Sequence, residues 1–125
     1  ELMRTHWDDY DYFFMHHKET DRAGHDGERD AKVAAIEEVD AVIPQILDLQ
    51  PDVLVVTGDH SSPTQLFAHS WHPVPTIVWG PHVGRDDVTT FGERAATRGL
   101  LGQMPSMYLM RLMLAAAGKL EKYGA

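Results

Sequence analysis

Short runs of hydrophobic residues predict three strands. Residues 12–15 and 53–56 are each apolar or aromatic without alternation, which is typical of buried strands. The second run is rich in β-branched residues and predicts a strand that is covered on both faces. Residues 76–79 predict a third strand, which is entered through Pro73 and Pro75 and closed by Gly80 with Pro81. We therefore expect three short strands, the first two of them buried.

Two longer segments predict helices. Between residues 28 and 50, apolar positions recur at steps of three and four, at Ile36, Val39, Ile43, Ile46 and Leu47. Pro51 ends this pattern, and Pro44 lies inside it, where we expect a kink or an early break. Residues 105–117 are apolar almost all round, and Gly118 behind them is typical of a helix end. We read this second segment as a buried helix.

The remaining segments are polar, and they complete the predicted fold. Residues 16–27 and 83–102 are interpreted as loops, and Ser62-Pro63 predicts the start of a short helix over residues 63–68. Strands that alternate with helical segments predict an α/β fold with a largely parallel sheet and flanking helices. The 125 residues suffice for one core, so we expect a single segment over residues 1–125.

The composition bears on which partners the chain can bind and on its compartment. A net charge of −8, from 11 basic and 19 acidic residues, disfavours a nucleic-acid surface, which needs a basic stripe. The longest apolar run falls far short of the ~20 residues of a bilayer span, so we expect no membrane partner. Cysteine is absent and no secretory signal opens the sequence, which predicts a cytoplasmic protein.

Histidine is the unusual residue type. The chain holds eight histidines, about three times an ordinary share, and most of them lie between His16 and His72 close to carboxylates. Imidazole nitrogens and carboxylate oxygens, without thiolates, favour hard divalent metal ions. The sequence therefore points toward a metal site made of nitrogen and oxygen ligands.

The first candidate group follows the first predicted strand. Asp21 and His25 are four residues apart, and Gly24 between them frees the backbone so that both side chains can converge on one ion. The alternative is a turn in which Asp26 caps the following helix. Lys18 nearby is a candidate phosphate contact, although a solvated surface lysine is the simpler interpretation.

The second group, Asp59 and His60, again follows a predicted strand. Both side chains are costly to bury unless they are paired or bound to metal, and the alternative is an exposed loop in which they pair with each other. Since ligands bind at the carboxyl ends of strands in open α/β sheets, we expect both groups at one sheet edge. His69 or His72 could complete the ligand set, and the spacing leaves that choice open.

Four motifs follow one another in an order that resembles a known family. They are TDRAGHDG at residues 20–27, TGDHS at 57–61, HSWHPVP at 69–75 and GKLEKYGA at 118–125. Together they resemble the C-terminal part of cofactor-independent (2,3-bisphosphoglycerate-independent) phosphoglycerate mutase of the archaeal type, within the alkaline phosphatase superfamily. The resemblance covers residues 10–125 and implies an alkaline phosphatase-like fold.

The resemblance also implies a ligand set for two divalent ions, above all manganese, with magnesium, zinc or cobalt as alternatives. Asp21 and His25 match ligands of one ion, and Asp59 and His60 match ligands of the other. The third ligand of the first ion matches His69, and His72 is the second choice.

Finally, the resemblance implies that this chain is a fragment. The serine nucleophile and the arginine-bearing substrate domain of the family match nothing here, so we expect no catalytic residue and no turnover in residues 1–125 alone. The parent would interconvert 3-phosphoglycerate and 2-phosphoglycerate in glycolysis through a phosphoserine. The alternatives are a metal-dependent phosphatase or phosphodiesterase of the same superfamily, or a non-enzymatic metal-binding module. We also expect that such a fragment can self-associate through an exposed sheet edge.

Overall fold

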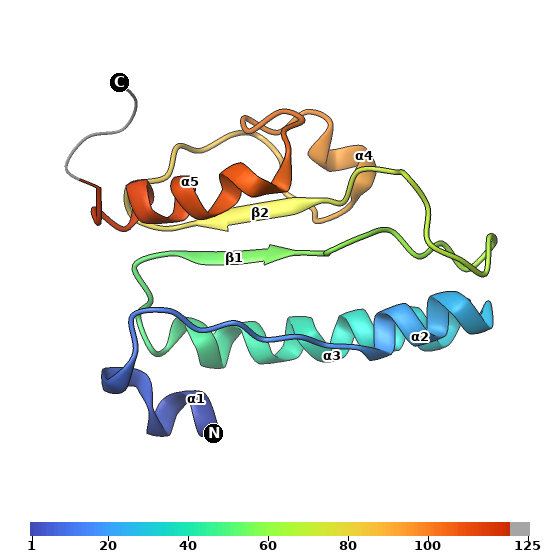
Figure 1. Cartoon of the computed structure of the whole chain (residues 1–125), viewed down its shortest axis with the longest axis horizontal. Helices are drawn as coiled ribbons and strands as arrows, with labels where there is room; N and C mark the ends of the chain where they lie inside the picture. The colour runs from blue at the N-terminus through green and yellow to red at the C-terminus, as the bar shows by residue number, and fades with distance from the viewer. Residues whose placement is uncertain (121–125) are drawn as a thin grey trace. The chain divides into compact units, whose positions relative to one another are not determined.

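The computed structural model describes residues 1–120 (Figure 1). The chain divides into two compact units. The first consists of Glu1–Gln50 and Ser62–Ser70, and the second of Pro51–Ser61 and Trp71–Ala125. The last part of the GKLEKYGA motif, residues 121–125, lies outside the described residues.

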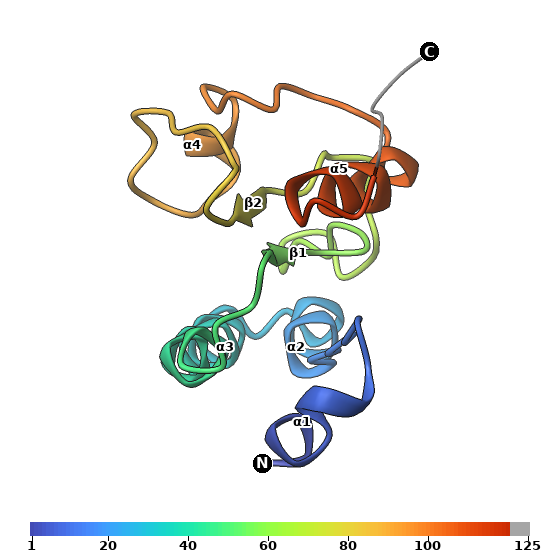
Figure 2. The same ribbon diagram turned by 90° about the vertical axis from the view of Figure 1, so that its left-hand side faces the viewer.

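The first unit is helical. Its elements are α1 (Leu2–Thr5), the 3-10 helix η1 (Trp7–Asp9), α2 (Glu19–Asp26) and α3 (Arg29–Leu47). Helices α2 and α3 pack side by side, as the end-on view in Figure 2 shows. Ala23 of α2, with Ala35 and Ile46 of α3, forms the buried core of this unit. Small residues on facing helices allow their backbones to approach closely.

The helix expected over residues 28–50 is confirmed as α3, with two differences. Pro44 does not break it, because the proline lies only one turn before the end at Leu47, where few intrahelical bonds remain to be lost. Ile36 is exposed and Ala35 is buried in its place, whereas the other predicted positions, Val39, Ile43, Ile46 and Leu47, are buried or half-buried as expected.

Two other predictions for the first unit are wrong. Residues 16–27 are not a loop, because α2 occupies most of them. Its buried residues are Ala23 and Gly24. The sequence therefore shows no helical repeat of large apolar residues in this segment. Residues 12–15 form no strand, since none of the described residues pairs with them, and the side chain of Phe14 is 76% exposed.

The second unit contains the two strands. β1 (Leu54–Thr57) and β2 (Thr76–Trp79) pair so that Leu54 lies opposite Trp79 and Thr57 lies opposite Thr76. Behind them come α4 (Glu93–Ala96), the 3-10 helix η2 (Ser106–Tyr108) and α5 (Leu109–Ala116), which lies alongside the strands (Figures 1 and 2). The second and third predicted strands and the predicted final helix are thus present. The burial expected of the second strand and of the final helix is wrong, because α5 has no buried residue and Met110 is 43% exposed, and β1 and β2 contain no fully buried residue.

The α/β class is confirmed, but the described strands do not run parallel. β1 and β2 are antiparallel. Parallel strands need a crossover connection, usually a helix, whereas the helix expected over residues 63–68 is a series of turns. The loop expected over residues 83–102 contains the short helix α4. None of the helices described between residues 1 and 120 combines the length and the apolar character that crossing a bilayer requires.

Candidate metal centre

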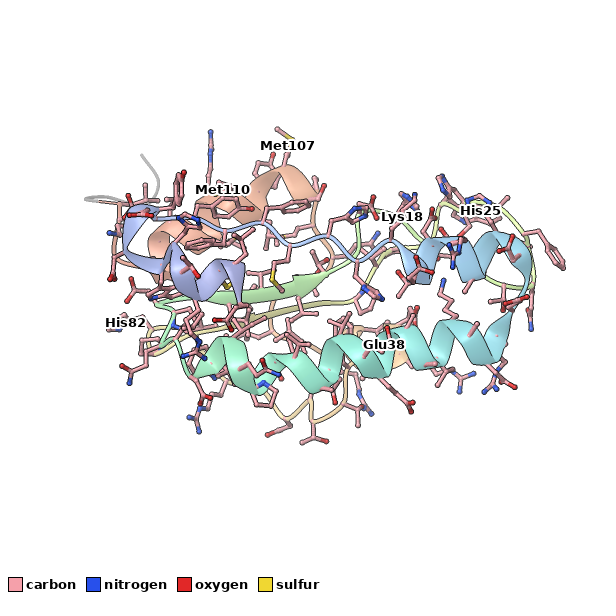
Figure 3. All side chains as sticks on the ribbon, turned by 90° about the horizontal axis from the view of Figure 1, so that it is seen from below. Lys18, His25, Glu38, His82, Met107 and Met110 are labelled. Atoms are coloured by element: carbon pink, nitrogen blue, oxygen red, sulfur yellow. The ribbon has the colours of Figure 1, made fainter. Side chains whose placement is uncertain are left out.

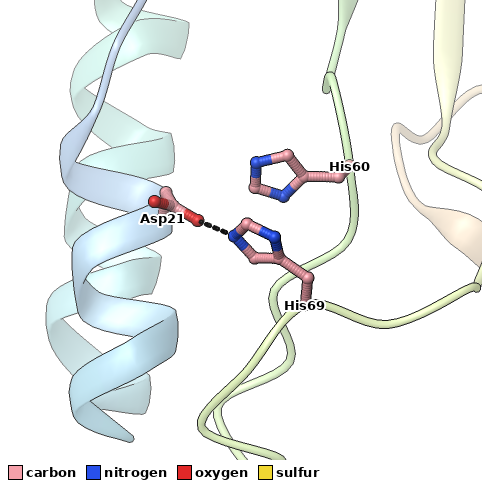
Figure 4. Close-up of side chains that lie close together, drawn as sticks. All are labelled: Asp21, His60 and His69. Carbon is pink, nitrogen blue, oxygen red and sulfur yellow. Dashed lines mark ion pairs between the residues drawn. The ribbon is translucent and has the colours of Figure 1, made fainter.

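Asp21 is the central residue of the first candidate group. It lies in the first half of α2, and its side chain is only 13% exposed. Its Oδ1 atom lies 3.3 Å from Nε2 of His69, the ion pair marked in Figure 4, and 3.6 Å from Nε2 of His25. The two imidazole rings stand 4.9 Å apart between centroids, at 61° to each other. Two imidazole nitrogens thus converge on one carboxylate oxygen.

Each imidazole nitrogen lies at a distance from Asp21 Oδ1 that fits two ligands of one divalent ion. His25 follows Asp21 by one helical turn, so α2 presents both side chains on one face. Ligand atoms about 2.1 Å from an ion, in tetrahedral positions, lie roughly 3.4 Å from each other. The observed 3.3 and 3.6 Å are close to that spacing. One carboxylate and two imidazoles are donors that manganese, zinc and similar ions accept.

Two hydrogen bonds hold Asp21 in its charged form. Lys18 Nζ donates to Oδ2 at 2.5 Å, and the Ser62 hydroxyl donates to Oδ1 at 2.7 Å. The bond from Lys18 and then the bond from Ser62 keep the pKa of the Asp21 carboxyl well below its usual range, against a smaller opposing effect of burial. Asp21 therefore needs no deprotonation before it can bind a cation.

The segment from Ser62 to Ser70 carries His69 to α2, and two glycines let it approach. A Cβ at Gly24 would overlap the carbonyl and Cβ of Ser62, and a Cβ at Gly27 would overlap the ring of Phe67. Gly27 also ends α2 with a φ of 75°, which favours glycine. The role predicted for Gly24 is therefore corrected: it sits inside a helix and admits a neighbouring backbone.

Lys18 precedes α2 and His25 lies in its last turn, and Figure 3 labels both. Lys18 is 64% exposed, as expected of a surface lysine, and it also contacts Asp21, the candidate ligand. Asp26 caps nothing at the start of α3, whose N-cap residue is Glu28. The capping alternative for this motif is therefore wrong.

The second candidate group lies just after β1 in the second unit. Asp59 is 70% exposed, its Oδ2 lies 3.4 Å from Nε2 of His60, and its Oδ1 accepts a hydrogen bond from the His60 backbone N–H at 3.1 Å. Asp59 belongs to no group of three or more carboxylates and imidazoles within residues 1–120. This pair could supply two ligands to an ion, and other residues would have to supply the remaining ligands of that ion.

The other histidines lie elsewhere. His72 stacks on Trp71 in the second unit, with 5.0 Å between ring centroids. His6 bonds Asp9 at 2.8 Å. His17 Nε2 is buried 3.8 Å from Glu38 and has no hydrogen-bond partner among the described residues. Within the first unit the structure thus brings His69 to Asp21.

Sequence reasoning missed two residues that shape the first group. Ser62 was expected to cap a helix, yet its hydroxyl bonds Asp21, and Lys32 of α3 donates to the Ser62 carbonyl at 2.5 Å. The partners are separated by 41 and 30 residues. No local pattern signals contacts over such distances.

The fold and this donor set are those of an α/β segment with a candidate metal site. It belongs to the Metalloenzyme superfamily, which matches residues 2–116. Membership in a metalloenzyme superfamily agrees with the divalent metal binding that the histidines and carboxylates predict.

Relatives named probable 2,3-bisphosphoglycerate-independent phosphoglycerate mutase confirm the resemblance stated from the motifs. Those from Thermotoga maritima, Thermus thermophilus and Aquifex aeolicus are 52%, 51% and 47% identical over all 125 residues. The chain spans 31% of their length. A solved structure of a Pyrococcus horikoshii protein matches 95% of this chain and 37% of its own, with a TM-score of 0.89 and 40% identity.

Proposed function

We propose that residues 1–125 are the metal-binding C-terminal segment of a 2,3-bisphosphoglycerate-independent phosphoglycerate mutase. The parent protein would convert 3-phosphoglycerate to 2-phosphoglycerate in the glycolysis of the cytoplasm. The observation that carries this proposal is the convergence of two imidazoles on the largely buried carboxylate of Asp21. The names of relatives about half identical along the whole chain support the choice of reaction.

In this proposal Asp21, His25 and His69 hold one divalent ion, and Asp59 and His60 contribute to a second. Manganese is the first expectation for both. When bound, such ions supply positive charge that offsets the charge on phosphoryl oxygens during transfer. The role of this chain is to present ligands. Asp21 lies on α2, and the segment from Ser62 to Ser70 places the His69 ring beside its carboxylate.

In this proposal no residue of the segment is the nucleophile. Ser62, the buried serine of the group, donates a hydrogen bond to the Asp21 carboxylate. At 5% exposure its hydroxyl is not open to a phosphorylated substrate. The nucleophile and the substrate-binding groups would therefore lie outside residues 1–125, and the segment alone would show no turnover.

A chimera tests this function. Residues 1–125 replace the matching segment of the Thermotoga maritima relative, and conversion of 3-phosphoglycerate is measured with manganese. We expect activity in the chimera and none in residues 1–125 alone. His69→Ala in the chimera should remove most of the metal-dependent activity, because one of few ligands is lost. His72→Ala is the matched control and should cost far less.

Three results would contradict the proposal. The first is a folded chimera that lacks mutase activity. The second is a chimera that hydrolyses a generic phosphate ester but leaves phosphoglycerate unchanged, which would favour a phosphatase of the same superfamily. The third is turnover by residues 1–125 alone, well above a blank with manganese only, which would show that the segment is a complete enzyme.

A further inference from the structure

Ser62 is the one polar side chain that the described part of the chain buries, at 5% exposure. Buried polar groups require hydrogen-bond partners, and Ser62 has them on both sides. Its hydroxyl bonds Oδ1 of Asp21 at 2.7 Å, and its carbonyl accepts from Lys32 Nζ at 2.5 Å. The residue is thus fixed between a candidate metal ligand and helix α3.

The direction of the bond to Asp21 follows from chemistry. An ionised carboxylate has no proton to give, so the Ser62 hydroxyl must donate. The accepting atom, Oδ1, is the same oxygen that His25 and His69 approach. A carboxylate oxygen carries two lone pairs, so it can accept this hydrogen bond and still bind a cation.

We propose that Ser62 is a positioning residue for the first metal group, which orients Asp21 so that Oδ1 faces both imidazoles. This inference rests on the proposed function in that Asp21, His25 and His69 hold a divalent ion. Outer-shell hydrogen bonds to a ligating carboxylate set its orientation and its affinity for metal.

Ser62 suits this role better than Lys18, the other partner of Asp21. Lys18 is 64% exposed, holds the opposite oxygen, Oδ2, and must order a long side chain to do so. Ser62 needs only one side-chain torsion, and its backbone is pressed against Gly24 of α2 and bonded by Lys32. A short donor on a fixed backbone restricts the carboxylate more tightly than a long donor in solvent.

The test uses the 125-residue chain with Ser62→Ala, and Ser61→Ala as the matched control. Ser61 is the adjacent serine, and its hydroxyl makes no hydrogen bond within residues 1–120. Manganese affinity is measured by calorimetry. We expect Ser62→Ala to weaken binding by about 10- to 100-fold, as loss of an outer-shell partner does. Ser61→Ala should leave the affinity unchanged, and Ser62→Thr, which restores a hydroxyl, should recover most of it.

A metal-free measurement keeps this inference separate from the proposed function. The three-bond Hα–Hβ couplings of Asp21 report whether its side chain holds one rotamer. We expect one large and one small coupling in the unaltered chain and in Ser61→Ala, and averaged couplings in Ser62→Ala. If the unaltered chain shows this pattern yet binds no manganese, the proposed function fails while the orienting effect of Ser62 on Asp21 holds.

The opposite result would overturn the inference and leave the proposed function standing. In that case the unaltered chain and Ser62→Ala bind manganese equally well and show the same Asp21 couplings. A merely structural role for Ser62 would appear as a lower melting temperature of Ser62→Ala without any change in affinity or couplings. That outcome also contradicts the positioning role.

Discussion

The two candidate ligand groups differ in how the chain holds their side chains. Asp21 in the first unit is nearly buried and is bonded by Lys18 and Ser62, from opposite sides of its carboxylate. Asp59 in the second unit is mostly exposed and bonds the backbone and ring of its own neighbour, His60. One carboxylate is oriented by Lys18, one helical turn away, and by Ser62, 41 residues away, and the other only by the adjacent residue.

This difference bears on metal binding because an oriented ligand loses less side-chain entropy when an ion binds. In the first group two imidazoles lie near one carboxylate oxygen within one unit, from α2 and from the segment that ends at Ser70. The adjacent pair in the second unit offers two ligands. We therefore expect the first group to bind a divalent ion within residues 1–125, and the second to depend on ligands from elsewhere in the parent protein.

The largest expected effect comes from removing the charge of each carboxylate in turn. Asp21→Asn should weaken manganese binding by the 125-residue chain more than about 100-fold, because losing an outer-shell partner alone costs about 10- to 100-fold. Asp59→Asn should leave this affinity nearly unchanged. Calorimetry with manganese measures both. A greater loss from Asp59→Asn than from Asp21→Asn would reverse the comparison of the two groups.

A smaller effect should follow from adding one methyl group to α2. In an exposed helix, glycine to alanine stabilises by about 1 kcal/mol. At Gly24 the new Cβ would overlap the Ser62 carbonyl, a backbone atom that cannot move freely. Gly24→Ala should therefore destabilise the chain, by about 1–3 kcal/mol, the usual cost of overpacking. It should also weaken manganese binding, since Ser62 is displaced from Asp21.

Gly92→Ala is the matched control for this change. A Cβ at Gly92 meets no atom within 4 Å, and its φ of 165° is extended backbone that alanine adopts. Urea unfolding of the two variants measures the free energy of unfolding. Stabilisation by Gly24→Ala would show that the segment after Ser62 does not pack closely against α2.

The sequence predicted elements with clear patterns and failed where structure depends on distant partners. α3, β1 and β2 carry apolar periodicity or β-branched runs, and all three are present. α2 was missed because small residues form its buried face. Residues 12–15 have a strand-like pattern, but a strand exists only when another strand pairs with it, and residues 1–120 supply none.

The same reasoning applies to the candidate site. The sequence linked Asp21 to His25 by their spacing of four residues in an expected loop, whereas the structure places that spacing on a helix, where it is one turn. It could not choose between His69 and His72, because that choice depends on where a turn-rich segment meets α2. The antiparallel relation of β1 and β2 was missed because Ser62-Pro63 looks like a helix start, while the Ser62 hydroxyl bonds Asp21, 41 residues away.

The smallest expected effect concerns Asp86, an exposed carboxylate that is nevertheless held by backbone groups. Its oxygens accept hydrogen bonds from the N–H of Val88 at 3.0 Å and of Leu100 at 2.8 Å, which ties together two ends of the segment between β2 and η2. The bond from Leu100 and then that from Val88 lower the pKa of Asp86 below its usual 3.8. Asp86 is thus a carboxylate outside the candidate metal site that hydrogen bonds hold in place although it is exposed.

The sign of the pH dependence follows from that lowered pKa. A carboxyl whose pKa is lower in the folded chain adds stability that is fully present above its unfolded pKa, and that stability is lost as the pH falls through the folded value. Asp86→Ala should therefore reduce the free energy of unfolding at pH 7, and the difference from the unaltered chain should shrink toward about pH 2. Asp87→Ala, which removes a neighbouring carboxylate without a hydrogen bond in residues 1–120, should change little at either pH. Urea unfolding at both pH values measures this, and an equal loss at both would show that Asp86 stabilises the segment by contacts that do not require its charge.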